Sequence, residues 1–217
     1  MESVSGSLVR RSLERSYAGR EAAYAAEIAR IIEATYRVIQ RTGSFDPTMR
    51  DILKASRLST DAFYRHFRSK DELMLALLED GRMQLVSYLE HRMAKASAPA
   101  ARIRAWIEGV LAQAGDPQAA GRTRPFLANR DRLAAEFPAE QHASIDALIE
   151  LVAIEIARLS GRRVTDTKRL HADAEAIYDV TFGALHRYLT NRTKPGRADV
   201  ERVVTFCLSA VEGKGRR

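Results

Sequence analysis

Apolar side chains recur at intervals of three and four residues along most of this 217-residue chain, which is the spacing of amphipathic α-helices. The first stripe predicts a helix over 21–42, and Gly43 suits the left-handed position that often follows a helix. Residues 1–20 are polar with scattered apolar groups, so we expect a mostly disordered basic arm. The members of the first stripe are Ile28, Ile31, Ile32, Thr35 and Ile39.

Three short segments with clear boundary signals come next. Residues 48–51 have the capping-box pattern with Thr48 as the N-cap, which predicts a short helix. Ser59 is an N-cap candidate for a second short helix over 60–67. Residues 69–72 form another capping box, which predicts the start of a long helix.

The remaining two thirds of the chain has the same helical periodicity and no convincing strand pattern. One or two short helices, interrupted at Pro125, are predicted over 118–137. The predicted fold class is therefore all-α, with about nine helices. The other helices predicted in this part cover residues 69–96, 101–114, 138–159, 166–190 and 197–211.

Basic side chains exceed acidic ones most strongly in the first third of the chain. The whole chain has 35 Lys and Arg against 28 Asp and Glu, a formal net charge of +7. Residues 1–70 hold 13 basic and 8 acidic side chains, a net of +5, so residues 71–217 carry the other +2. An anionic partner for the first third is one interpretation, and a solvated basic surface is the other.

Residues 48–67 have the length of a helix-turn-helix, in which a short turn joins two short helices. The second helix could enter a major groove of DNA, which is about 12 Å wide. A plain helical corner has the same pattern, so the spacing alone leaves DNA binding open. The side chains expected to point outward from the second helix are Thr60, Asp61, Tyr64 and Arg65.

The run TMRDILKASRLSTDAFYRHFRSKDELMLALLED, residues 48–80, resembles the DNA-binding signature of the TetR family of bacterial transcription regulators. The resemblance covers about residues 24–80, and its most specific part is residues 64–67 followed by residues 69–73. The residues that match the family pattern are Thr48, Ile52, Ser59, Tyr64, His66, Phe67, Lys70 and Leu73.

This resemblance implies a three-helix DNA-binding domain over 21–68 and a helical ligand-binding and dimerisation domain over 69–217, preceded by the arm over 1–20. It implies a homodimer that binds a palindromic operator in double-stranded DNA. The implied function is a ligand-responsive regulator, a repressor that a small-molecule effector releases from its operator. The alternative is a helical small-molecule-binding protein or enzyme with a vestigial helix-turn-helix.

The resemblance also implies roles for individual residues at the DNA. Thr48 and Lys70 would bind phosphates, and the helix N-terminus would assist Lys70. His66 would lie on the DNA backbone, although a packed, hydrogen-bonded histidine is the alternative. Arg65 would contact a base edge or remain solvated. The full set of DNA-binding candidates is Thr48, Arg57, Ser59, Thr60, Asp61, Tyr64, Arg65, His66 and Lys70.

Three positions depart from the family pattern. A small residue is usual at Leu53, Ala-Gly is usual at residues 56–57, and a small residue is usual at Asp61. Because Arg57 occupies the usual glycine position, we expect it at positive φ, with a strain of roughly 1 kcal/mol. Asp61 could accept a hydrogen bond from a cytosine amino group or favour the start of its helix.

The effector would lie among the middle helices of the second domain, and apolar walls predict a largely apolar effector. Ordinary core is the alternative role for every wall residue. The last two helices would pair with those of a second copy as a four-helix bundle, although a monomer core explains their apolar faces too. The pocket candidates are Trp106, Val110, Phe126, Leu127, Ile149, Val152, Tyr178 and Phe182.

Other chemistry is weakly indicated. No motif of an enzyme, a metal site or a nucleotide site stands out, so we expect no catalysis, no metal and no cofactor. A single cysteine, Cys207, excludes an internal disulfide. The sequence has no apolar run of membrane-spanning length and no signal-peptide pattern, so we expect no membrane partner and a cytoplasmic location.

Overall fold

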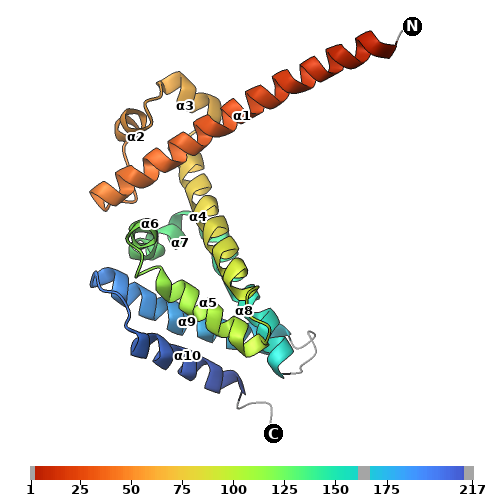
Figure 1. Cartoon of the computed structure of the whole chain (residues 1–217). Coiled ribbons are helices and arrows are strands. Elements are labelled where there is room, and N and C mark those ends of the chain that lie inside the picture. The colour runs from red at the N-terminus through yellow and green to blue at the C-terminus, as the bar shows by residue number, and fades with distance from the viewer. Residues whose placement is uncertain (1–2, 161–166, 213–217) are drawn as a thin grey trace. The chain divides into compact units, whose positions relative to one another are not determined.

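The computed structural model describes residues 3–160 and 167–212, and this part of the chain forms ten α-helices and no β-strand (Figure 1). The all-α prediction is therefore confirmed. Two compact units divide the chain, Met1–Met74 and Leu75–Arg217, called unit 1 and unit 2 below. The division lies inside α4 (Lys70–Met93), so one continuous helix belongs to both units.

Unit 1 begins with α1 (Ser3–Thr42), a single helix of 40 residues. The prediction of a disordered arm is therefore wrong for residues 3–20. Adding turns to an existing helix avoids the cost of nucleation, and no proline interrupts this stretch. At the other end, Gly43 has φ 69° and donates its amide N–H to a carbonyl in the last turn, as predicted.

Two short helices, α2 (Met49–Ser56) and α3 (Thr60–His66), complete unit 1 with the start of α4. Arg37 ties α1 to α2 by donating to the Ala55 carbonyl at 3.3 Å. The predicted apolar stripe of α1 faces the core of this unit. The buried apolar side chains are Ile31, Ala34, Tyr36, Val38, Ile39, Phe45, Ile52, Ala62, Phe63, Phe67, Leu73 and Met74.

Unit 2 is a helical bundle. Helix α5 packs against α8, α9 and α10 (Figure 1), and α8 also packs against α9. The shorter α6 lies on α9, and α7 lies on α8. The helices are α5 (Pro99–Ala112), α6 (Pro117–Ala128), α7 (Arg130–Glu136), α8 (Pro138–Ser160), α9 (Thr167–Thr190) and α10 (Arg197–Glu212).

The break predicted at Pro125 lies elsewhere, so that prediction is wrong. Pro125 lies inside α6, and the break between α6 and α7 falls at Asn129. Proline removes one helical hydrogen bond and can kink a helix, but here the helix continues through Pro125 for three more residues. Asn129 leaves helical geometry at φ −115° and ψ 18°, and its side-chain Nδ2 donates to the Pro125 carbonyl at 2.8 Å.

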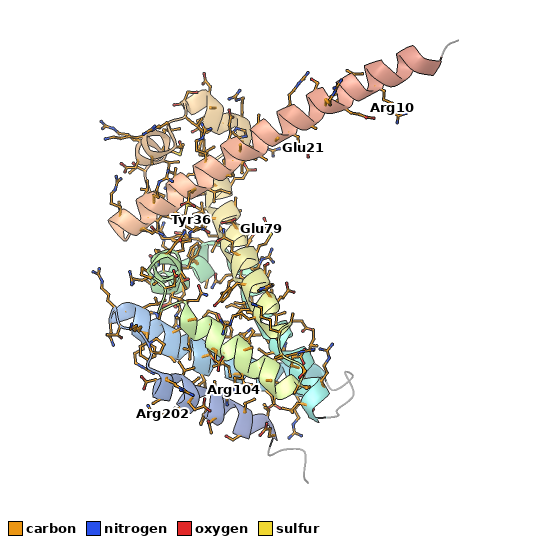
Figure 2. The ribbon with its side chains drawn as sticks, viewed as in Figure 1. Arg10, Glu21, Tyr36, Glu79, Arg104 and Arg202 are labelled. Atoms are coloured by element: carbon orange, nitrogen blue, oxygen red, sulfur yellow. The ribbon has the colours of Figure 1, made fainter. Side chains whose placement is uncertain are left out.

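Trp106 is fully buried in the core of unit 2, where its ring lies 6.2 Å from that of Phe182. Two ion-pair groups join the surrounding helices. Glu155, only 5% exposed, accepts from Arg102 at 3.3 Å and Arg158 at 2.5 Å. Arg104 on α5, labelled in Figure 2, makes two hydrogen bonds, of 2.6 and 2.9 Å, to the Glu201 carboxylate on α10.

None of the described helices combines the length and the apolar character that crossing a membrane requires.

Candidate DNA-binding site

Hydroxyl caps fix the starts of α2 and α3. The Thr48 Oγ1 accepts from the Asp51 amide at 3.1 Å and donates to the Asp51 carboxylate at 2.7 Å. The Ser59 Oγ accepts from the Ala62 amide at 3.1 Å. Each cap satisfies an amide that the helix itself leaves unpaired, so both N-cap predictions are confirmed.

Arg57 ends α2 in the left-handed region, with φ 56° and ψ 35°, as predicted from its position in the turn. This conformation costs a non-glycine residue roughly 1 kcal/mol or more, because the β-carbon approaches the backbone carbonyl. The side chain is exposed. Arg57 therefore places an exposed cation in the turn between α2 and α3, and its backbone is strained there.

Replacing Arg57 with glycine is expected to raise the free energy of unfolding by about 1 kcal/mol, because glycine adopts positive φ without strain. The same change should weaken DNA binding, because a cation beside the recognition helix is lost. Urea unfolding and DNA titration measure the two effects. Arg192→Gly is the matched control, since Arg192 has φ 54° in unit 2 and its loss should stabilise without affecting DNA. A variant no more stable than the wild type would contradict the strain argument.

One side of α3 is exposed to solvent while the other holds the helix on unit 1. Ala62, Phe63 and Phe67 are at most 5% exposed and anchor it. Tyr64 is 55% exposed. The remaining exposed residues at the start and along the outer side of α3 are Ser59, Thr60, Asp61 and Arg65. The structure thus brings these five predicted residues onto one surface.

His66 does not belong to that surface, so its predicted exposure at the DNA is wrong. Its side chain is only 1% exposed, and its Nε2 lies 2.6 Å from Glu27 Oε2 on α1. The ring also makes an edge-on contact with Tyr24, with centroids 4.2 Å apart. Among the described residues, its Nδ1 has no hydrogen-bond partner. The packed, hydrogen-bonded alternative for His66 is the observed one.

Glu27 and Tyr24 form a clamp on the end of α3 that the sequence analysis missed. Glu27 Oε2 also lies 3.4 Å from the Arg65 guanidinium, and the Tyr24 hydroxyl donates to the Arg65 carbonyl at 3.0 Å. Both residues precede Ile31 on the same face of α1, at helical spacings. A carboxylate in line with a buried stripe is the signal that could have revealed them.

Glu27→Gln tests this clamp through the pH dependence of the free energy of unfolding. The hydrogen bond from His66 lowers the Glu27 pKa, the charges of Arg65, His66 and Arg30 add to this, and burial opposes it. A carboxylate with a depressed pKa stabilises the fold above its unfolded pKa and loses that contribution as the pH falls through its folded pKa. The wild type should therefore be more stable at neutral pH, and the difference should vanish in acid. Urea titrations across pH measure it, and a constant difference throughout the acid range would contradict the assignment.

The remaining two candidates lie at the starts of α2 and α4. Thr48 is exposed, but its hydroxyl hydrogen already bonds to Asp51. Lys70 is 35% exposed and forms an ion pair with Asp46. Either side chain would have to exchange an internal acceptor for a phosphate in order to bind DNA, which reduces the net gain of each contact.

The predicted pocket residues gather in the core of unit 2 or against it. Trp106, Val110, Ile149, Val152 and Phe182 are at most 9% exposed. Leu127 and Tyr178 are partly buried and pack on that core, and Phe126 is half-buried on α6. These residues lie where ordinary core residues lie, as the alternative interpretation expects. Their role as walls of an effector pocket stays a prediction.

Two aromatic side chains of this set, Tyr178 and Trp106, each carry a polar atom in a largely apolar setting. The Tyr178 ring stacks on Phe182 with centroids 4.3 Å apart, and burial raises the pKa of Tyr178 to about 12, so it is neutral at ordinary pH. The indole Nε1 of Trp106 is buried without a hydrogen-bond partner among the described residues. An unpaired buried donor is costly, and an acceptor brought by a ligand would satisfy it.

Comparison with known proteins shows which protein family the region around α2 and α3 resembles. Residues 31–77, which include α2, α3 and the start of α4, match the family model described as "Bacterial regulatory proteins, tetR family". A search of curated proteins found no match.

Solved structures match over nearly the whole chain. A TetR-like transcriptional regulator from Rhodococcus sp. RHA1 is 18% identical, with a TM-score of 0.63 over 88% of this chain and 98% of its own. A TetR transcription regulator from Haloarcula marismortui is 16% identical, with a TM-score of 0.66 over 87% and 98%. Reduced NemR from E. coli is 16% identical, with a TM-score of 0.66 over 84% and 95%. At this identity the likeness establishes the fold.

The family match and the fold agree with the two capped short helices and the exposed polar side of α3. Residues 31–77 are therefore similar to the tetR family of bacterial regulatory proteins, and the chain has the fold of TetR-like transcriptional regulators.

Proposed function

We propose that this protein is a homodimeric transcriptional repressor that occupies a palindromic operator and leaves it when a small molecule binds. The observation that carries the proposal is the exposed polar side of α3, on a helix whose start is capped and whose end is clamped to α1. A helix held this rigidly can present side chains to a major groove with fixed geometry.

Each exposed residue then has a role at the DNA. Thr60, Asp61 and Arg65 contact base edges, with Asp61 accepting from a cytosine amino group. Tyr64 binds the phosphate backbone. Side chains around α3 position the protein on the duplex through phosphates, and these are Thr48, Arg57, Ser59 and Lys70.

Dimerisation follows from the size of the recognition surface. A single helix-turn-helix makes few contacts, and two copies spaced about 34–36 Å apart match successive major grooves. The large apolar residues of α9 are mostly buried within their own chain. The dimer interface must therefore be formed by other apolar side chains that are exposed. Phe206 on α10 is 62% exposed and Val180 on α9 is 37% exposed, which supports this pair of helices as the interface.

The effector binds beside Trp106, Tyr178 and Phe182 in this proposal. Their rings supply apolar contact, and the unpaired indole N–H of Trp106 favours an effector that carries a hydrogen-bond acceptor. Helix α4 is the natural carrier of the signal, because its first turn belongs to unit 1 and the rest to unit 2. A shift of α4 would change the separation of the two recognition helices.

Loss of a phosphate contact and loss of a contact to a base edge should change DNA affinity in different ways. Lys70→Ala should weaken binding to operator and random DNA alike and reduce the slope of log affinity against log salt by about 2, since each phosphate contact contributes about 0.9 and a dimer has two. Thr60→Ala and Arg65→Ala should instead cost about 1–3 kcal/mol on the operator alone. Fluorescence anisotropy on both duplexes across a salt series measures the difference. Equal losses on both duplexes for Arg65→Ala would make Arg65 a backbone contact.

The proposal as a whole is tested by gel shift against the DNA that flanks the gene of this protein. A retarded band that unlabelled specific DNA competes away more effectively than random DNA is the expected result. No complex at low salt would favour a helical ligand-binding protein or enzyme with a vestigial helix-turn-helix.

A further inference from the structure

The first half of α1 carries a line of large side chains that the described part of unit 1 leaves uncovered. Leu13, Tyr17 and Tyr24 are 52%, 65% and 48% exposed. They follow one another at spacings of four and seven residues, so they share one face of the helix. The buried Ile31 comes seven residues after Tyr24, so the core-facing stripe of α1 continues onto its exposed half.

This outer stripe, defined here as Leu13, Tyr17, Arg20 and Tyr24, starts at the end of the recognition helix. Tyr24 contacts the last turn of α3 through its hydrogen bond to the Arg65 carbonyl. From there α1 continues past α3, and the side chains of Arg10 and Glu21 stand clear of α2 and α3 (Figure 2). The stripe thus meets α3 at its last turn, next to Arg65 of the surface proposed to bind DNA.

The chemistry of the stripe suits a phosphate backbone. Among its four side chains Arg20 carries a positive charge and lies over the Tyr17 ring at 5.8 Å from the centroid. Tyr17 and Arg20 both offer donors, and phosphate oxygens are acceptors that take hydrogen bonds from tyrosine and arginine. Glu14, further out, is already paired with Arg10 at 3.3 Å.

We propose that the first half of α1 lies along the phosphate backbone of DNA next to the segment that α3 contacts, with Tyr17 and Arg20 donating to phosphates. The inference rests on the proposed function and extends it to DNA outside the operator core. Residues 10–24 rise by about 21 Å, since an α-helix rises about 1.5 Å per residue. At about 3.4 Å per nucleotide, the stripe covers about six further base pairs on each side.

The test uses the full-length protein and an operator selected from randomised duplexes. Affinity is measured by anisotropy across a salt series for the bare operator and for the operator with about ten added base pairs on each side. Arg20→Ala removes a charge from the stripe. Arg15→Ala is the matched control, since Arg15 is exposed on the same stretch but out of register with the stripe. Tyr17→Phe removes only the hydroxyl, and circular dichroism checks that every variant stays helical.

The wild type should bind the extended duplex several-fold more tightly than the bare operator, and Arg20→Ala should lose that gain while Arg15→Ala keeps it. The salt slope on the extended duplex should fall by about 2 for Arg20→Ala, since each lost phosphate contact contributes about 0.9 and a dimer has two. Equal effects of the two variants, or no gain from the added DNA, would overturn the inference and leave the proposed function intact. A change of oligomeric state in Arg20→Ala would instead assign the stripe to a second copy of the chain. A wild type that binds no duplex would overturn both proposals.

Discussion

Replacing Phe63 with alanine is expected to destabilise the protein by about 3–5 kcal/mol and to abolish DNA binding. Phe63 is fully buried, and its ring lies 5.7 Å from Phe67 and 5.3 Å from Tyr64. Alanine would leave a cavity beneath α3, which is only seven residues long and depends on its packing for stability. Chemical denaturation followed by circular dichroism measures the loss, and anisotropy measures DNA binding.

The neighbouring aromatic residue supplies the matched control. Tyr64 is 55% exposed, so Tyr64→Ala should change the free energy of unfolding by no more than about 0.5 kcal/mol. It should nevertheless weaken DNA binding, because its hydroxyl is lost from the recognition surface. The two variants therefore distinguish the packing of α3 in unit 1 from its direct contact with DNA. A Tyr64→Ala protein with unchanged affinity for DNA would contradict the orientation assigned to α3.

The second large effect is a coupling between effector and operator of about 5–150-fold in affinity. By linkage, an effector that weakens operator binding by some factor must itself bind the operator complex more weakly by the same factor. Trp106 is the single tryptophan and lies in the core of unit 2, so its fluorescence reports on effector binding there. Screening small molecules by Trp106 emission and then titrating operator with and without a positive compound measures the coupling.

Trp106→Ala, Phe126→Ala and Tyr178→Ala test where the effector binds. Variants that remain folded dimers should bind operator normally yet respond poorly to effector, because these residues lie in unit 2 and the recognition surface lies in unit 1. The Trp106 variant must be followed by DNA release, since its reporter is gone. Wild-type responses in all three variants would show that the effector binds elsewhere. Tight effector binding with unchanged operator affinity would contradict the switch.

The sequence was most informative where structure depends on neighbouring residues. The caps at Thr48 and Ser59, the left-handed Arg57 and the helix end at Gly43 each depend on a few adjacent positions, and each was predicted. The apolar stripe from Ile31 to Ile39 likewise predicted the buried face of α1. Local hydrogen bonding and helical periodicity are sufficient for such features.

Features that depend on distant residues were missed or wrong. The partner of His66 is Glu27, 39 positions away, so the residues next to His66 in the sequence do not show that the imidazole is buried rather than facing DNA. The helical state of residues 3–20 depends on continuation of α1, which composition alone did not reveal. Periodicity also cannot separate a core residue from a pocket wall, so the role of Trp106 stays a prediction.

In the proposed dimer, two copies of α3 occupy successive major grooves of one DNA duplex. Hydroxyl-radical footprinting on the DNA that flanks the gene tests it most directly. We expect two protected patches centred about 10–10.5 base pairs apart, or a multiple of this distance, with symmetric sequence beneath them. A single patch, or no protection at low salt, would contradict it.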